Sequence, residues 1–171
     1  MSLPARIALV GFMCSGKTTV GRILASRLGY AFIDTDAEVE RRAGTPVDAI
    51  FRERGEAGFR DLEAGVIASL AGRARIVIAA GGGAPVQERN RAFLSRDART
   101  FSLIVSLAAA RRRAHGAALR PLLAQDDETV RRLYEERLSL YAQVGTPVET
   151  EGRTPREVTE EIIGLLGGPT R

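Results

Sequence analysis

The chain of 171 residues has no tryptophan, one cysteine (Cys14), one histidine (His115) and one lysine (Lys17). A single cysteine cannot form an internal disulfide, and without a Cys/His cluster a structural zinc site is not expected. No apolar run approaches the roughly 18 residues of a membrane span, and no fixed-period repeat or low-complexity tract is present. These absences predict a cytoplasmic protein with no membrane partner.

Length and composition are those of one globular domain. Hydrophobic residues make up 44% and charged residues 27% of the chain, which is ordinary for a soluble domain with its own core. The net charge of +4 permits anionic partners but does not argue for nucleic acid. Only six phenylalanines and three tyrosines accompany the arginines, and no nucleic-acid-reading motif is present, so we expect no nucleic-acid partner. With no long apolar seam left over, we expect a monomer.

Short apolar runs alternate with segments of helical spacing. Strands are expected at residues 7–10, 31–33, 76–79 and 101–105, with a weaker one near 147–150. Helices are expected at residues 16–28, 56–70, 126–143 and from 155 to about 166, with a further helix start at 45–48. This alternation predicts an α/β fold whose parallel sheet is covered on both faces. Ligands of such sheets bind beyond the carboxyl ends of the strands.

The loop after the first expected strand carries the strongest motif. Residues 11–18, Gly-Phe-Met-Cys-Ser-Gly-Lys-Thr, match the phosphate-binding loop G-x-x-x-x-G-K-[ST] between a strand and a helix. Its backbone N–H groups and the helix dipole suit a nucleotide phosphate, Lys17 can reach the β- and γ-phosphates, and Thr18 can supply a hydroxyl to Mg²⁺. Lys17 is the one basic residue of 25 that is not arginine, and a compact ammonium suits a tight phosphate pocket. The alternatives are a glycine-rich turn and a lysine placed by chance.

Two carboxylates, Asp34 and Asp36, follow the second expected strand. Residues i and i+2 of an extended chain point the same way, so both would lie on one side, close to the phosphate loop. We expect Asp34 to face Mg²⁺ and its waters, and Asp36 to orient a substrate hydroxyl and accept its proton. The alternative is that Asp36 only caps a helix over residues 37–43.

Two arginines lie at positions that would bury a charged guanidinium group. Arg137 falls on the apolar stripe of its expected helix, and Arg60 lies beside Phe59 with Glu63 three residues on. A buried guanidinium needs an anion, and two converging arginines suit a carboxylate. Glu63 would hold Arg60 in position, although the pair could also be a surface ion pair of little consequence.

Two further stretches could approach a ligand. Three glycines, residues 81–83, end the third expected strand and suit close backbone approach, although a tight turn would use them equally well. Arg120 precedes Pro121 between a strand and a helix, where a phosphate-closing lid would lie.

Taken in order, these residues resemble the shikimate kinase family, ATP-dependent enzymes of aromatic amino acid biosynthesis. The resemblance runs from Ile7 to about Leu166. It rests on the phosphate loop, Asp34-Thr35-Asp36, Phe59-Arg60 with Glu63, Gly81–Gly83, Arg120-Pro121-Leu122-Leu123, and Arg137 with Tyr141. It implies a single three-layer α/β/α P-loop kinase domain with a five-stranded parallel sheet. A substrate-binding helical region at about 34–63 and a mobile lid at about 113–125 would complete that domain.

The resemblance also implies site roles. ATP would bind the phosphate-loop residues Cys14, Ser15, Gly16, Lys17, Thr18 and Thr19 and three arginines, Arg113, Arg120 and Arg153. Of these arginines, Arg120 would close from the lid onto the phosphates, while the other two would flank the adenine. Mg²⁺ would bind Thr18, with Asp34 in support through water.

On the acceptor side the resemblance implies that shikimate binds Asp36, Arg60, Gly81, Gly82 and Arg137, with Glu63 bracing. Its catalytic residues would be Lys17, Asp36 and Arg120, and its products shikimate 3-phosphate and ADP.

Two departures from the family pattern stand out. Cys14 replaces a common glycine, and residues 113–116 differ from the usual glycine-rich lid. Two other functions compete. One is another small-molecule kinase resembling gluconate kinase, which need not place the two arginines for a ring carboxylate. The other is a non-catalytic ligand sensor, which should lack Lys17, Asp36 or Arg120, and this chain keeps all three.

Overall fold

A five-stranded sheet forms the centre of the computed structural model, which describes residues 3–114 and 126–167. The strands are β1 (Arg6–Gly11), β2 (Ala31–Asp34), β3 (Ile76–Ala79), β4 (Arg99–Ile104) and β5 (Thr146–Glu149). Their order is β2-β3-β1-β4-β5, and every pairing is parallel. The predicted strands are therefore confirmed, including the weak fifth one, and the strand that leads into the phosphate loop is central.

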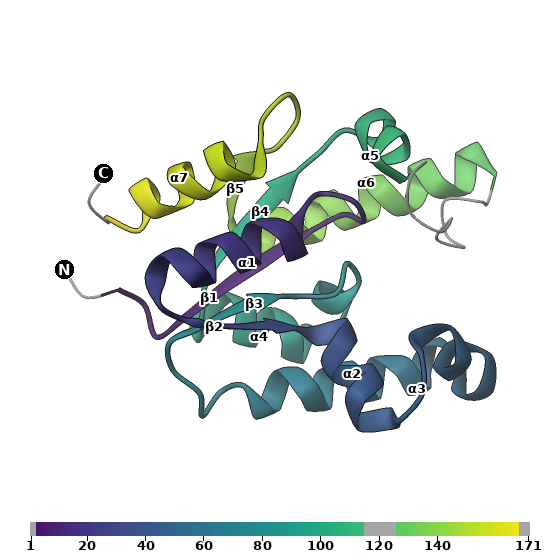
Figure 1. The fold of residues 1–171 in the computed structure, drawn as a ribbon. Coiled ribbons are helices and arrows are strands. Elements are labelled where there is room, and N and C mark those ends of the chain that lie inside the picture. Colours follow the sequence, from purple (N-terminus) through teal and green to yellow (C-terminus); the bar gives the residue numbers. More distant parts are fainter. Residues whose placement is uncertain (1–2, 115–125, 168–171) are drawn as a thin grey trace.

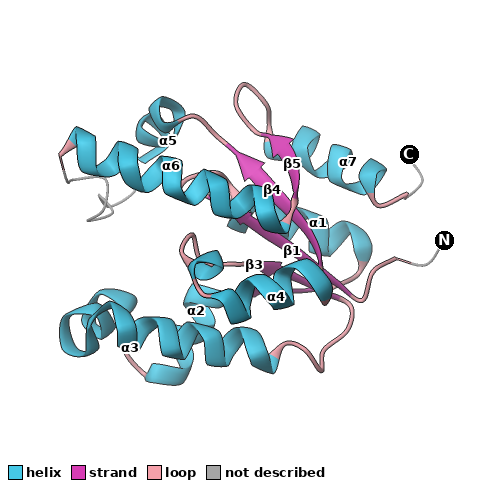
Figure 2. Cartoon of the chain, turned by 180° about the vertical axis from the view of Figure 1, so that it is seen from behind, coloured by secondary structure: helices cyan, strands magenta, loops and turns pink. Residues whose placement is uncertain are grey.

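Helices cover both faces of the sheet, as the apolar strands predicted. They are α1 (Lys17–Leu28), α2 (Thr35–Ala43), α3 (Val47–Ser69), α4 (Glu88–Arg96), α5 (Leu107–Ala114), α6 (Asp127–Val144) and α7 (Pro155–Leu165), with a 3₁₀ turn η1 (Ala84–Val86). Helices α1 and α7 lie on the face turned toward the viewer in Figure 1. On the opposite face, α4 and α6 lie in front of the strands in Figure 2, and α3 lies beside α4, below the strands in that view.

The core divides into two layers because side chains of β1 alternate between the two faces. Ile7 and Leu9 pack with α1 and α7, whereas Ala8 and Val10 pack with α3, α4, α5 and α6. These four side chains are at most 1% exposed. Burying the central strand on both faces fixes the position of the loop that follows it, which is why the phosphate loop begins from a rigid base.

One local prediction is wrong. Helix α2 already begins at Thr35, so Asp34 and Asp36 do not share an extended segment, and Asp34 is the helix cap: its Oδ1 accepts from the backbone N–H of Asp36 at 3.1 Å. The two expected helix starts, at residues 45–48 and at Glu56, are confirmed: α3 begins at Val47, and Gly55 (φ 68°, ψ −177°) has non-helical backbone angles that divide α3 into two helical stretches. Helices α4 and α5 were not predicted, because each buries only three residues toward the core.

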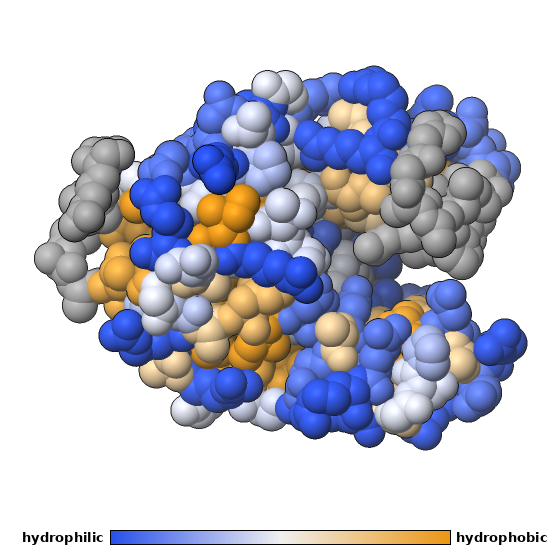
Figure 3. Space-filling view, viewed as in Figure 1, coloured by the Kyte–Doolittle hydropathy of each residue, from blue (hydrophilic) through white to orange (hydrophobic). Residues whose placement is uncertain are grey.

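The carboxyl ends of the strands, where parallel sheets bind ligands, lie beside a hollow in the molecular surface. Figure 3 shows the surface hollowed on the right-hand side, above the lobe that α2 and α3 form. Of the lid expected at about 113–125, residues 113 and 114 are the end of α5, and residues 115–125, with His115 and Arg120, lie outside the described residues. Within the described ranges, no helix is long and apolar enough to cross a membrane.

Candidate active site

The phosphate loop is a tight turn between β1 and α1. Gly11 and Gly16 have positive φ (150° and 98°), and a Cβ on Gly11 would lie 2.6 Å from the carbonyl oxygen of Leu103, so only glycine fits there. Cys14 also has a positive φ of 60°. The Lys17 ammonium folds over the loop and donates to the carbonyls of Gly11 (2.8 Å) and Phe12 (3.0 Å). The loop thus presents its cation and the start of α1 at the same edge of the sheet.

Thr18 and Asp34 meet at this edge. The Thr18 hydroxyl donates to Asp34 Oδ2 at 2.8 Å, while the other carboxylate oxygen caps α2. The sequence predicted both residues as neighbours of a magnesium ion, and the structure brings them into direct contact. A hydroxyl beside a carboxylate is the oxygen chemistry that Mg²⁺ prefers.

One cavity of about 230 Å³ gathers most of the predicted residues. Its walls are Cys14, Gly16, Lys17, Thr18, Thr19, Asp34, Asp36, Ala79, Ala80 and Gly82. The phosphate loop, both aspartates and the glycine loop after β3 therefore share one space. Ser15 is 1% exposed, and its hydroxyl has no hydrogen-bond partner among the described residues.

Glu63 and Arg60 form an ion pair of 2.9 Å at the edge of this space, on successive turns of α3. Glu63 is fully buried, and this burial raises the pKa of its carboxyl group, an effect that the Arg60 guanidinium opposes. An ideal Cβ on Gly81 would lie 2.6 Å from Glu63 Oε1 and 2.5 Å from Asp36 Oδ1. The pair is thus a buried brace beside Asp36 and not a surface contact.

Arg137 projects from α6 with a buried guanidinium nitrogen, Nη1, that has no hydrogen-bond partner among the described residues. Burial lowers the pKa of Arg137, and the positive charge of Arg60 adds to this effect. One turn further along, Tyr141 donates its hydroxyl to the carbonyl of Gly82 at 2.7 Å. Two neighbouring guanidinium groups, one of them with a buried unpaired donor, form a suitable site for a carboxylate.

Three arginines were predicted on the nucleotide side, and the structure describes two of them. Arg113 donates to the backbone carbonyls of Cys14 (3.2 Å) and Thr150 (2.8 Å), so it lies against the phosphate loop. Arg153 pairs with Glu161 on α7 and donates to two backbone carbonyls. Their contacts with adenine stay predictions, as does the role of Arg120.

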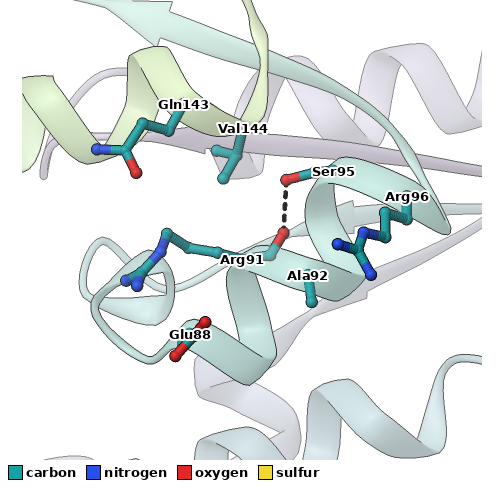
Figure 4. Close-up of a pocket in the computed structure, with 7 residues that line it drawn as sticks. All are labelled: Glu88, Arg91, Ala92, Ser95, Arg96, Gln143 and Val144. Carbon is teal, nitrogen blue, oxygen red and sulfur yellow. Dashed lines mark hydrogen bonds between the residues drawn. The ribbon is translucent and has the colours of Figure 1, made fainter.

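A second cavity, of about 280 Å³, lies between α4 and the end of α6, and Figure 4 shows its lining: Glu88, Arg91, Ala92, Ser95, Arg96, Gln143 and Val144. None of these is a predicted site residue. Arg91 donates to the carbonyls of Pro85 and Val86 at 2.7 Å, so its charge serves the η1 turn. The arrangement suited to chemistry is therefore the smaller cavity at the strand ends.

Sequence reasoning missed two side chains that organise this cavity. Thr35 is fully buried and accepts from the backbone N–H of Gly81 at 2.8 Å, and Tyr141 donates to the carbonyl of Gly82; both residues belong to motifs of the family resemblance, but neither was given a role in the site. The signal that could have identified them is a hydroxyl group at a position where the neighbouring residues predict burial, because a buried hydroxyl requires a hydrogen-bond partner.

The phosphate loop follows the central strand of a parallel sheet, Asp36 lines the same cavity, and Arg60 and Arg137 both interact with Glu63 beside Asp36. This arrangement defines a P-loop kinase for a small acidic acceptor. The family model described as shikimate kinase matches residues 13–166. The shikimate kinase of Persephonella marina is 39% identical over 160 residues, covering 94% of this chain and 98% of the relative. That of Halorhodospira halophila is 44% identical over 168 residues, covering 96% and 95%. The chain belongs to the shikimate kinase family.

Solved structures support the same family assignment. The shikimate kinase of Acinetobacter baumannii in complex with shikimate superposes with a TM-score of 0.90 at 38% identity, covering 96% of this chain and 93% of that chain. A gluconokinase from Sinorhizobium meliloti has a TM-score of 0.61 at 19% identity, covering 98% and 94%, and shares the fold alone. The gluconate-kinase-like alternative therefore has weaker support.

Proposed function

We propose that this protein transfers the γ-phosphate of ATP to the 3-hydroxyl of shikimate, giving shikimate 3-phosphate and ADP on the route to the aromatic amino acids. The observation that carries this proposal is that Lys17 of the phosphate loop and the Asp36 carboxylate line one cavity, while Glu63, which interacts with Asp36, also interacts with both guanidinium groups. Family membership supplies the identity of the acid, which the residues alone do not.

At the nucleotide end, the phosphates would lie on residues 14–19, with Arg113 and Arg153 flanking the adenine. The contact between Thr18 and Asp34 supports a magnesium site there. Mg²⁺ commonly takes one or two protein oxygens together with phosphate oxygens and water. This agrees with the lack of any group of three potential ligand side chains (His, Cys, Asp or Glu) in residues 3–114 and 126–167. Bound there, Mg²⁺ would neutralise charge on the β- and γ-phosphates.

At the acceptor end, Arg60 and Arg137 would hold the shikimate carboxylate, and the backbone at Gly81 and Gly82 would meet a ring hydroxyl. The unpaired Nη1 of Arg137 supports this assignment, because a buried cationic donor is stabilised by an anion. Asp36 would orient the reacting hydroxyl and accept its proton.

Phosphoryl transfer needs in-line positioning and positive charge around the transferring group more than covalent chemistry. Lys17 and Arg120 would supply that charge, with Arg120 closing from a lid over residues 113–125. We expect the enzyme to act as a cytoplasmic monomer.

The test is ADP release from Mg²⁺-ATP, followed with a coupled assay against a panel of hydroxy acids including shikimate and gluconate. We expect shikimate to give the highest kcat/KM and the product to carry phosphate on the 3-hydroxyl. Faster turnover of gluconate would support the gluconate-kinase alternative instead. ATP binding without turnover of any acid would indicate a sensor.

A further inference from the structure

The glycine loop, residues Gly81–Gly83, is held by two buried hydroxyl groups from opposite sides. Thr35 Oγ1 accepts from the backbone N–H of Gly81 at 2.8 Å, and Tyr141 donates to the carbonyl of Gly82 at 2.7 Å. Thr35 is fully buried and Tyr141 is 1% exposed. One hydroxyl fixes an N–H and the other a C=O, so the orientation of two successive peptide groups is set.

Thr35 connects this loop to the carboxylates. Its neighbours Asp34 and Asp36 both line the cavity, whereas Thr35 faces the buried backbone of Gly81. The first residue of α2 is thereby tied to the end of β3. The next residue carries the carboxylate whose Oδ1 would lie 2.5 Å from a Cβ on Gly81. The Thr35 hydrogen bond therefore sets how far Asp36 lies from the glycine loop.

Tyr141 connects the same loop to the arginines. Arg137 lies one helical turn before Tyr141, and the backbone carbonyl of Tyr141 accepts from the Ser102 hydroxyl at 2.8 Å, which ties this end of α6 to β4. At the other end of the loop, an ideal Cβ on Gly83 would lie 2.1 Å from Arg60 Nη2. The loop thus has Asp36 at its Gly81 end and Arg60 at its Gly83 end, and Tyr141 joins it to the helix that carries Arg137.

We propose that Thr35 and Tyr141 are positioning residues that hold the glycine loop as a fixed spacer between Asp36 and the guanidinium pair. A rigid ring acid carries its hydroxyl and its carboxylate at a fixed separation, so the two groups that bind them have to be held at a constant distance from each other. This inference rests on the proposed function only in that the acceptor carries both groups. Thr35 acts mainly on the alignment of the reacting hydroxyl, hence on kcat. Tyr141 acts mainly on the KM for the acid, because it sets the position of Arg137.

The first experiment replaces Thr35 with valine, which keeps the shape and removes the acceptor. We expect kcat per folded enzyme to fall about tenfold or more, since sub-ångström misplacement of a reacting group is costly, while the KM for ATP is unchanged. Thr35→Ser keeps the hydroxyl and should restore most of kcat. The matched control is Thr159→Val on α7, which removes another fully buried hydroxyl, bonded to the carbonyl of Pro155 at 2.8 Å, and should keep kcat.

The second experiment compares Tyr141→Phe with the control Tyr30→Phe. In the wild-type protein the Tyr30 hydroxyl donates to the carbonyl of Pro4 at 3.0 Å, and Tyr30 does not line the cavity. Tyr141→Phe should raise the KM for shikimate about tenfold with a smaller change in kcat, and Tyr30→Phe should change neither. If Thr35→Val does not fold, Thr35→Ala against Thr35→Ser gives the same comparison.

Three results would overturn the proposal. The first is wild-type kcat in Thr35→Val accompanied only by a lower melting temperature, as for a merely structural hydroxyl. The second is a failure of Thr35→Ser to restore kcat. The third is a Tyr141→Phe variant that changes the KM for ATP and not for the acid. If the wild-type enzyme prefers another ring acid, the proposed function fails but these comparisons hold with that acid.

Discussion

Gly81 has no room for a methyl group, and this makes Gly81→Ala a direct test of the cavity's geometry. The added Cβ would lie 2.5 Å from Asp36 Oδ1 and 2.6 Å from Glu63 Oε1, roughly 0.8 Å short of ordinary van der Waals contact. The φ angle of Gly81 is not positive, so backbone strain does not contribute. Because Glu63 is fully buried and paired with Arg60 at 2.9 Å, we expect the Asp36 carboxylate to move.

The magnitude follows from that displacement. A shift of about 1 Å in a reacting group costs roughly 100-fold in rate, so kcat for shikimate should fall about 100-fold. The KM for ATP should stay near its wild-type value because the phosphate loop is not touched. Overpacking should also lower the free energy of unfolding by about 1–3 kcal/mol. Coupled ADP release and urea denaturation measure the two effects separately.

Gly65→Ala is the matched control. It makes the same substitution on α3 two residues after Glu63, and no atom lies within 4 Å of the added Cβ. Alanine in a helix interior should raise the free energy of unfolding by about 0.5–1 kcal/mol and leave kcat unchanged. Wild-type kcat in a folded Gly81→Ala enzyme would refute the view that the glycine loop positions Asp36.

Three further predictions concern charged groups. Lys17→Met should fold normally yet lose at least about 100-fold in kcat, and Asp36→Asn should lose nearly as much. Wild-type kcat in Lys17→Met would contradict the role of Lys17 in phosphoryl transfer. Arg137→Ala should raise the KM for shikimate roughly 10- to 100-fold, so an unchanged KM would argue against a carboxylate contact. Because burial raises the pKa of Glu63, the stability that the protonated carboxyl contributes should be lost as pH rises from about 4.5 through the folded-state pKa. Glu63→Gln should lack that pH dependence in urea denaturation, and equal pH profiles would contradict the assignment.

The parts of the site that the sequence predicted are those fixed by local chemistry. The phosphate loop is a backbone shape that two glycines and a helix start determine, so its residue spacing is sufficient to predict it. The pairing of Arg60 with Glu63 follows from helical spacing. The sheet was predictable because its inner strands β1 and β3 are apolar and buried on both faces.

Other parts depend on tertiary contacts. The extended geometry expected for Asp34 and Asp36 is wrong because Asp34 caps a helix that begins at the next residue. A capping aspartate and a strand-end aspartate look alike in a sequence. The bond from Tyr141 to Gly82 joins residues 59 positions apart, and no periodicity predicts such a pair. Helix α5 was missed because its buried side chains are three alanines.

The most direct test of the account is a crystal structure with ADP, Mg²⁺ and shikimate bound together. The account predicts that the 3-hydroxyl of shikimate lies within about 2.6–3.2 Å of the Asp36 carboxylate. The ring carboxylate should contact Arg137, and the ADP phosphates should lie on the loop at Lys17. Shikimate bound away from Asp36, or with its carboxylate turned from both arginines, would contradict it.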